Sequence, residues 1–252
     1  MAGSKLGIAI ARLAIVVALF ALWETLSRIG IVNPRLLPSA SDTFAMLFEL
    51  LQRAGVRNDL VVTASEVLTA FALAVPFGAL IGFLIAENRY FAEVVKPLLF
   101  FAFSIPKSIF LPMFILVFGV GFAQKVGFGF FSTIFIVIMS TTTAVESVKP
   151  ENLLVARSYG ATPAQTIWRV YVPSMLPVLL EALRISMIFN LTGVMLAEMY
   201  ASRDGIGHLI ANWGENFMMR QLLAGVLMVA AIAIAFNELV RWVETRCSHW
   251  RT

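Results

Sequence analysis

The stretch from Lys149 to Pro177, KPENLLVARSYGATPAQTIWRVYVPSMLP, carries more information about the fold than any other part of the sequence. It is the longest polar-rich interval between apolar segments in the second half of the chain, and it is basic. Residues 160–163 (Gly-Ala-Thr-Pro) separate two short helical patterns, and Pro173 closes the second. A mere connection between two membrane helices could be a few residues long. A structured elbow over residues 149–173 therefore indicates that another molecule docks on it.

The composition around this elbow is that of an integral membrane protein. Of 252 residues, 60% are hydrophobic and 13% are charged, and the mean hydropathy is +0.87. Soluble domains are about half apolar and about a quarter charged. The net charge of +4 could suggest nucleic acid. However, the basic residues are scattered over short loops, so membrane topology explains them better and no nucleic-acid partner is expected.

Six apolar segments are long enough to span a bilayer, which takes about 20 residues for a hydrocarbon core of about 30 Å. They exceed the length of barrel strands and lack sustained alternation, so we expect helices. The sequence therefore predicts an all-α integral membrane protein, with one transmembrane domain over residues 1–252. The predicted spans cover residues 7–26, 61–86, 94–120, 126–145, 176–199 and 222–243.

The third predicted span is the least regular. Pro97, Pro106 and Pro112 interrupt it. Proline removes a backbone donor and kinks a helix, which a membrane tolerates only where protein or water satisfies the freed groups. We expect this span to face protein or a cavity rather than lipid.

Lysine and arginine in the short loops predict the orientation. The short outer loops contain only Lys125, Arg203 and Arg220. With the N-terminus inside, ten basic residues are cytoplasmic. They are Lys5, Arg12, Arg89, Lys96, Lys149, Arg157, Arg169, Arg241, Arg246 and Arg251. We predict an N-in, C-in topology, which places the elbow in the cytoplasm.

The long first outer loop has a structure of its own. Ser39 to Asp42 read as a turn and a helix N-cap. Residues 43–53 then alternate apolar and polar side chains at helical spacing. We expect a short amphipathic helix that lies on the outer surface.

The elbow resembles the EAA loop of binding-protein-dependent ABC importer permeases. Val155 and Ala156 occupy its two small positions, Gly160 and Ala161 follow, and a Val-Tyr-Val-Pro ending closes it. The position that is acidic in the family is Leu154 here, which is a departure from its pattern. The resemblance implies that an ATPase contacts the elbow. The coupling residues carried over are Leu154, Val155, Ala156, Gly160, Ala161, Pro163 and Pro173.

Physical reasoning on the elbow leads to the same expectation. Ala156, Gly160 and Ala161 are small enough to let another backbone approach closely. A short helix held in a groove of a partner is a common recognition mode. Pro163 suits an early position of a second helix, where its missing donor has no intrahelical acceptor. The arm from Thr162 onward could then carry motion from an ATPase to the fifth span; an ordinary interfacial loop is the alternative.

The resemblance extends over nearly the whole chain and narrows to the branch that imports nitrate, sulfonates, taurine and thiamine precursors. Two further departures are Glu66, where a basic residue is usual, and Phe122, where an acidic residue often stands. The supporting strings are Leu-Trp-Glu at 22–24, Leu-Pro-Ser at 37–39, Ser-Ile-Pro-Lys at 104–107, Leu-Pro at 111–112, Phe-Gly-Val-Gly at 118–121, Ala-Glu-Met at 197–199 and Gly-Ile-Gly at 205–207.

The resemblance implies the fold, the partners and the function. The fold would be that of a type I ABC importer permease, and the function would be alternating-access import of a small anionic or zwitterionic solute. The expected partners are a second copy of the chain, two ABC ATPase subunits, a periplasmic or lipid-anchored substrate-binding protein and the lipid bilayer of the bacterial inner membrane. No cofactor is expected on this chain, because it has no GxxxxGK[ST] motif and ATP with Mg²⁺ would bind the ATPase.

Four polar residues in the spans are candidates for the translocation pathway. Lys107 lies near the middle of the third span, where insertion of a lysine costs about 2.5–3.5 kcal/mol. It could attract an anion, reach the interface, or pair with a carboxylate such as Glu66. Ser104 lies close to it. Asn190 could line the pathway or bond across helices, and Glu198 could gate the exit or cap a loop.

Two other classes of membrane protein fit the sequence less well. An autonomous secondary carrier or channel would need a coupling-ion site and often has an inverted repeat, and the sequence has no convincing repeat. An intramembrane enzyme would need a nucleophile and a base, which the sequence lacks. No catalytic residue is expected, and the methionines make no metal site because no His or Cys accompanies them.

Overall fold

The computed structural model describes residues 2–30, 32–33 and 35–247, and these fold into helices without strands. The α-helices are α1 (Ala2–Arg28), α2 (Ala40–Gln52), α3 (Ala54–Glu87), α4 (Arg89–Ser104), α5 (Leu111–Phe118), α6 (Phe122–Glu146), α7 (Pro150–Ser158), α8 (Pro163–Thr166), α9 (Val172–Tyr200), α10 (Ile206–Glu215) and α11 (Met219–Cys247). The 3₁₀ turn η1 (Lys107–Phe110) precedes α5, and the π-helical turn η2 (Ile167–Tyr171) precedes α9.

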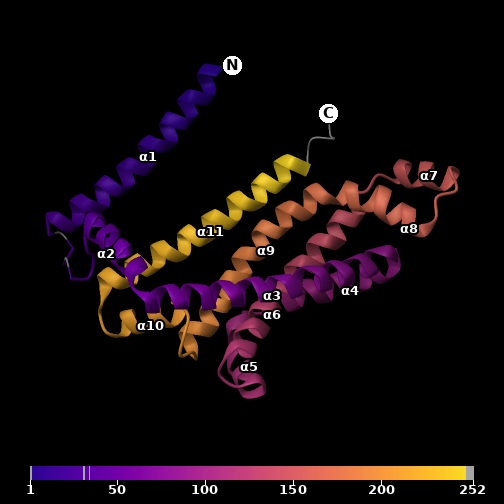
Figure 1. Cartoon of the computed structure of the whole chain (residues 1–252). Helices are drawn as coiled ribbons and strands as arrows, with labels where there is room; N and C mark the ends of the chain where they lie inside the picture. The colour runs from indigo at the N-terminus through magenta and orange to yellow at the C-terminus, as the bar shows by residue number, and fades with distance from the viewer. Residues whose placement is uncertain (1, 31, 34, 248–252) are drawn as a thin grey trace.

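The centre of the molecule is the packing of α6 between α3 and α9, while α1 stands away from this bundle (Figure 1). Glycines let the helices approach closely. A Cβ added at Gly82 of α3 would lie 2.6 Å from the backbone oxygen of Ile138 in α6. One added at Gly193 of α9 would lie 2.6 Å from Ser132 Oγ in α6. Since real Cβ atoms do not come this near, the helix crossings depend on these glycines.

Five helical segments of the described chain are long and apolar enough to cross a membrane, and a sixth is possible if one bent pair counts as a span. The prediction of an all-helical membrane protein with about six spans is therefore confirmed. Most of the helices extend beyond the predicted spans. For example, the second span was placed at 61–86, but α3 already begins at Ala54, and the fifth continues a helical rod that starts at Pro163.

The third predicted span is broken rather than kinked. α4 ends at Ser104, and the axes of α4 and of the η1–α5 segment differ by 78°. Of the three prolines, only Pro106 lies at the break; Pro97 is inside α4 and Pro112 is in the first turn of α5. The residue before a proline is driven out of the helical region, and Ile105 is extended accordingly (φ −71°, ψ 127°).

The amphipathic helix predicted in the long first loop is confirmed as α2, with Ser39 as its N-cap accepting a hydrogen bond from Asp42 N. Its apolar face does not lie free on a surface. Met46 and Leu50 pack into a core cluster with Trp213 of α10 and Met228 of α11. α1 is attached mainly through α2 and the loop before it. The indole of Trp23 donates to the Pro38 carbonyl at 2.9 Å.

Candidate functional site: the elbow and the buried charge network

The first helix of the elbow, α7, begins and ends with residues suited to those positions. Pro150 occupies its first turn. At the other end, Gly160 has φ +68°, Gly160 N donates to Arg157 O at 3.0 Å, and Ala161 N donates to Ala156 O at 3.0 Å. This pair of bonds is the Schellman motif, which needs a left-handed residue and favours glycine. The backbone turn itself therefore favours glycine at position 160.

The second part of the elbow continues into the fifth span. Thr162 Oγ1 accepts from Gln165 N at 3.3 Å, and Gln165 Oε1 accepts from Thr162 N at 2.9 Å, which is a capping box. Pro163 follows in the first turn of α8, as predicted. From there η2 and α9 extend the helix to Tyr200, and together they form a rod of 38 residues. Pro173 lies in the first turn of α9 and does not end the rod.

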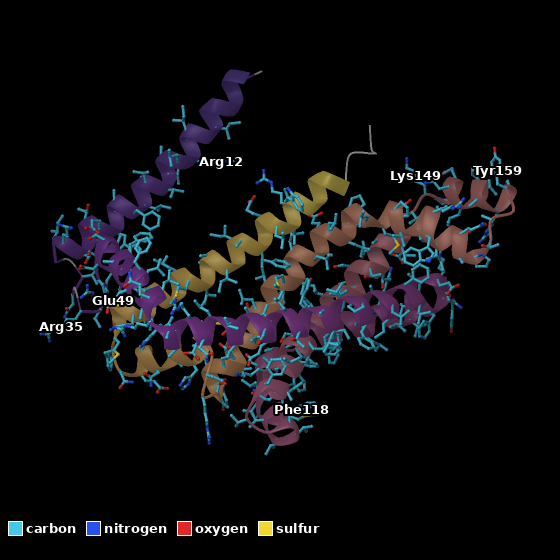
Figure 2. All side chains as sticks on the ribbon, in the orientation of Figure 1. Arg12, Arg35, Glu49, Phe118, Lys149 and Tyr159 are labelled. Atoms are coloured by element: carbon cyan, nitrogen blue, oxygen red, sulfur yellow. The ribbon has the colours of Figure 1, made fainter. Side chains whose placement is uncertain are left out.

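One face of the elbow is anchored and another is open. Tyr171 contacts Phe83 of α3 edge to face, with ring centroids 5.5 Å apart, and Leu153 packs on the cluster at the end of α6. By contrast, Leu154 is 67% exposed, Trp168 71% and Tyr159 87%. Figure 2 shows Lys149 and Tyr159 at the extreme end of the molecule. The elbow thus presents large apolar side chains on a firmly held support.

The coupling residues carried over from the resemblance all lie in this segment. Val155 is exposed like Leu154, while Ala156 and Ala161 are half-buried on either side of the turn. Gly160 and Pro163 are exposed, and Pro173 is half-buried. The structure brings them together on the elbow, and their contact with an ATPase stays a prediction.

The two pathway candidates in the third span, Ser104 and Lys107, both donate to backbone carbonyls of α4. Ser104 Oγ donates to Phe100 O at 2.8 Å. Lys107 Nζ donates to Phe103 O at 2.9 Å and lies 4.3 Å from the centroid of the Phe103 ring. Backbone and ring together compensate the half-buried ammonium. The suggested pairing of Lys107 with Glu66 is wrong, because Glu66 has another lysine as its partner.

That partner is Lys125, which the sequence reasoning placed in a short outer loop. The correction follows from the helix boundary. α6 begins at Phe122, so Lys125 lies in its first turn with 1% of its side chain exposed. Its Nζ is 2.5 Å from Glu66 Oε1 and 2.6 Å from Asp204 Oδ1. It also donates to Ser202 Oγ at 3.1 Å. A buried charge needs such partners.

Asp204 lies outside the spans, in the segment between α9 and α10, and its side chain is 54% exposed. The hydrogen bond from the Lys125 ammonium holds the pKa of its carboxyl below the usual range. Neither Lys125 nor Asp204 was singled out from the sequence. The available signal was Glu66, an acid inside a span, which required a cation from a distant segment.

Glu198 takes part in a junction at the start of α10. Its Oε1 accepts from Thr63 Oγ1 and its Oε2 from Gly207 N, both at 2.6 Å. Ile206 N donates to Thr63 Oγ1 at 2.9 Å, and Gly205 N donates to an α3 carboxylate, Asp59, at 2.9 Å. Side chains of α3 and α9 thereby satisfy the free amides of α10. Of the two roles considered for Glu198, this geometry gives it the capping one; gating stays a prediction.

Asn190 is fully buried, and its Nδ2 donates to Val67 O at 2.7 Å. This is the bond across helices that the sequence allowed as an alternative to pathway lining. A cavity of about 540 Å³ lies between η1, α9, α10 and α11. Ser108, Tyr200 and Glu215 are polar residues of its wall, and the four predicted pathway residues are not part of it. Among the described residues no group of three or more His, Cys, Asp and Glu could hold a metal ion.

An all-helical bundle with five or six spans, a broken third span and an exposed helical elbow defines a multi-pass membrane permease. The chain belongs to the family of binding-protein-dependent transport system inner membrane components, whose sequence profile matches residues 74–249. Members of this family are permease subunits of ABC importers, so the chain is the membrane component of such a system and works with an ATPase and a substrate-binding protein.

Three relatives are similar over most of their length. The taurine transport system permease protein TauC of Escherichia coli is 25% identical, with 92% of this chain and 86% of that protein covered. The putative aliphatic sulfonates transport permease protein SsuC of Bacillus subtilis is 24% identical, with 92% and 84% covered. The formylaminopyrimidine transport permease protein ThiX of Halalkalibacterium halodurans is 26% identical, with 92% of each covered.

Solved structures show the same fold. An inward facing form of the MetNI methionine ABC transporter matches with a TM-score of 0.58 at 22% identity, covering 77% of this chain and 96% of that one. An amino acid ABC transporter matches with a TM-score of 0.57 at 16% identity, covering 82% and 96%. The prediction of a type I importer permease fold is therefore confirmed.

Proposed function

We propose that this chain imports a small sulfonate or a similar anionic or zwitterionic solute through a homodimeric pathway in the bacterial cytoplasmic membrane. Each elbow docks in the groove of one of two ABC ATPase subunits on the cytoplasmic side, in an N-in, C-in topology. The permease is non-catalytic. ATP and Mg²⁺ bind to the ATPase, and the binding protein delivers the solute on the other side.

One observation carries the coupling part of the proposal. The exposed side chains of Leu154, Tyr159 and Trp168 lie on an elbow that continues as an unbroken rod into the fifth span. Large apolar side chains at the tip of a rigid element are suited to a partner's groove. Leu154 stands at the position that is acidic in the EAA pattern that the elbow resembles, so hydrophobic burial would replace an ionic contact there.

The test is copurification and ATP hydrolysis in nanodiscs with the ATPase encoded beside this chain. Leu154→Arg places a charge in the apolar contact, and we expect at least a tenfold loss of ATPase binding, or about 1.4 kcal/mol. Ile29→Arg is the matched control, because Ile29 is also 67% exposed but lies in the segment between α1 and α2. Equal binding by wild type and Leu154→Arg would overturn the elbow as the docking site.

The solute class is supported by the names of the relatives. Two of the three are permeases for taurine and aliphatic sulfonates, whereas the third serves a formylaminopyrimidine. Uptake of labelled taurine, an alkanesulfonate and a pyrimidine by proteoliposomes with the complete system separates these choices. ATP-dependent uptake of the pyrimidine alone would exclude the sulfonate proposal while leaving the coupling proposal intact.

A further inference from the structure

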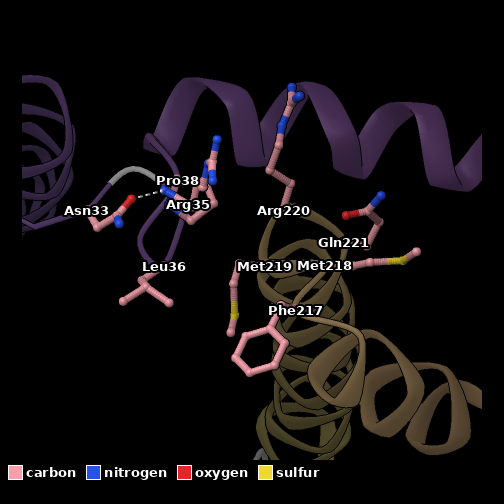
Figure 3. A pocket seen from close by; sticks show the side chains of 9 residues that line it. All are labelled: Asn33, Arg35, Leu36, Pro38, Phe217, Met218, Met219, Arg220 and Gln221. Atoms are coloured by element: carbon pink, nitrogen blue, oxygen red, sulfur yellow. Dashed lines mark hydrogen bonds between the residues drawn. The ribbon is translucent and has the colours of Figure 1, made fainter.

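A second exposed surface, which no other part of the described chain covers, lies at the end of the molecule opposite the elbow. Four residues between α1 and α2 and five residues around the start of α11 line a pocket of about 560 Å³ (Figure 3). They are Asn33, Arg35, Leu36, Pro38 and residues 217–221. Figure 2 shows Arg35 at this end and Tyr159 of the elbow at the other. We call it the Arg35–Arg220 pocket after the two arginines on its opposite sides.

The backbone at one wall of this pocket carries an unfavourable residue. α10 ends in a Schellman motif, since Phe217 N donates to Gly214 O at 3.1 Å and Met218 N donates to Trp213 O at 2.8 Å. Phe217 occupies the left-handed position with φ +56°, as the only non-glycine residue of the described chain with a positive φ. A bulky residue is strained there, and strained residues cluster at functional sites.

The fold buries little of the Phe217 side chain in return for this strain. It is 74% exposed. A glycine at this position would end α10 with less strain and would expose no aromatic surface. The phenyl group is therefore explained by a contact outside the chain, and Figure 3 shows it beside Leu36 and Met219 at the apolar side of the pocket.

The charge of the pocket defines what could fill it. Arg35 and Arg220 are the charged residues of its wall, and none of the described residues that line it is acidic. Arg220 lies 3.5 Å from Asp42, but both side chains are at least half exposed, so this pair is weak. Arginine, methionine and aromatic residues are the types enriched in protein interfaces. The pocket thus suits a carboxylate flanked by apolar side chains.

We propose that the Arg35–Arg220 pocket receives an acidic segment of the substrate-binding protein, with Phe217 as its apolar anchor. The inference rests on the proposed function, because the side of the membrane opposite the ATPase is where the binding protein arrives. Arginines can form bidentate hydrogen bonds to a carboxylate. Phe217, exposed in the free permease, would become buried on binding, and buried aromatic residues contribute much of the affinity of interfaces.

The experiment measures ATP hydrolysis by the complex in nanodiscs as the binding protein is titrated. In Arg35→Glu/Arg220→Glu and in Phe217→Gly we expect the half-maximal binding-protein concentration to rise at least tenfold. Phe217→Gly removes the anchor without disturbing the left-handed turn, so its loss of binding is not a loss of folding. Arg57→Glu is the control for charge reversal, because Arg57 is exposed in the first turn of α3 and outside the pocket.

The outcomes separate the two proposals. If the binding protein does not stimulate even the wild-type complex, the proposed function itself fails. If wild type is stimulated and the pocket variants behave like it, only the pocket inference is overturned. It is also overturned if Arg57→Glu loses as much, if the variants respond only to the phosphatidylglycerol content of the nanodisc, or if they separate a permease dimer into monomers.

Discussion

The two ends of the molecule terminate a helix with the same backbone hydrogen bonds but with opposite residues. At the elbow the left-handed position is Gly160, and at the far end it is Phe217. The elbow presents its large side chains, Tyr159 and Trp168, from backbone positions that do not have a positive φ. At the far end, the exposed Phe217 has a strained backbone with a positive φ. Glycine at the left-handed position is explained by the backbone turn alone. A bulky residue at the same position needs a further reason, which we infer to be contact with a partner protein.

The ends also differ in what holds them. The elbow's polar bonds are local, such as the Thr162–Gln165 capping box. The start of α10 instead depends on Asp59, Thr63 and Glu198, which lie on other helices. A partner can therefore grip the elbow without breaking bonds between spans, while the junction at α10 keeps three helices in one arrangement by itself.

The largest expected effect tests the other contact between distant helices, the buried pair of Lys125 on α6 and Glu66 on α3. Lys125→Met leaves the buried Glu66 carboxylate without a cation, and we expect a loss of about 3–5 kcal/mol in stability. Thermal unfolding in detergent measures it. The double variant Lys125→Met/Glu66→Gln removes both charges and should recover most of the loss. If Lys125→Met is as stable as wild type, the buried pair does not hold α3 and α6 together.

A smaller pair of effects should have opposite signs at the two turns. Gly160→Ala forces a Cβ into a left-handed backbone and should lower stability by about 1 kcal/mol. Phe217→Gly relieves the same strain and should raise stability by a similar amount of about 1 kcal/mol. Unfolding midpoints of both variants at one pH and in one detergent provide the comparison. Destabilisation by Phe217→Gly would mean that the phenyl ring packs within the chain.

The smallest expected effect is the pH dependence of Asp204. Lys125 lowers the pKa of this carboxyl in the folded protein, so their interaction stabilises the fold above the ordinary aspartate pKa of about 3.9. It is lost as the pH falls through the lower folded-state pKa. Asp204→Asn should cost below about 1 kcal/mol at pH 7, because the carboxylate is half exposed. The difference from wild type should shrink in acid; a constant difference would assign the effect to packing.

The sequence predicted those elements whose signals are local. Hydrophobic run length located the spans, Ser39 marked the start of α2, and the glycine–proline spacing located the elbow. The break in the third span was only partly foreseen, because three prolines could each have caused it and tertiary packing selected Pro106. Asn190 shows the same limit: its amide could reach either a pathway or a helix, and the position of Val67 on α3 decides the bond it makes.

The pairing within the buried charge network could not be predicted from the sequence, for a physical reason. Glu66, Lys125 and Asp204 are separated by dozens of residues. Glu66 and Lys125 meet where α3 packs against α6, and Asp204 comes from the segment between α9 and α10. The hydropathy pattern starts the fourth span at residue 126, so it leaves Lys125 in the preceding loop. The helix begins earlier, at Phe122, because Glu66 compensates the buried charge of Lys125. Only the isolated acid Glu66 indicated that such a partner had to exist.

The continuity of α8, η2 and α9 has a mechanical consequence. At 1.5 Å per residue, a rod of 38 residues is about 57 Å long, nearly twice the thickness of the hydrocarbon core. A tilt of about 5° around one end would sweep the other through about 5 Å. Leu154 sits beside one end of this lever, and Glu198 lies near the other. A displacement of the elbow would therefore tilt the whole rod and strain the hydrogen bonds of Glu198 with Thr63 and Gly207. No chain of rearranging side chains between the two ends would be needed.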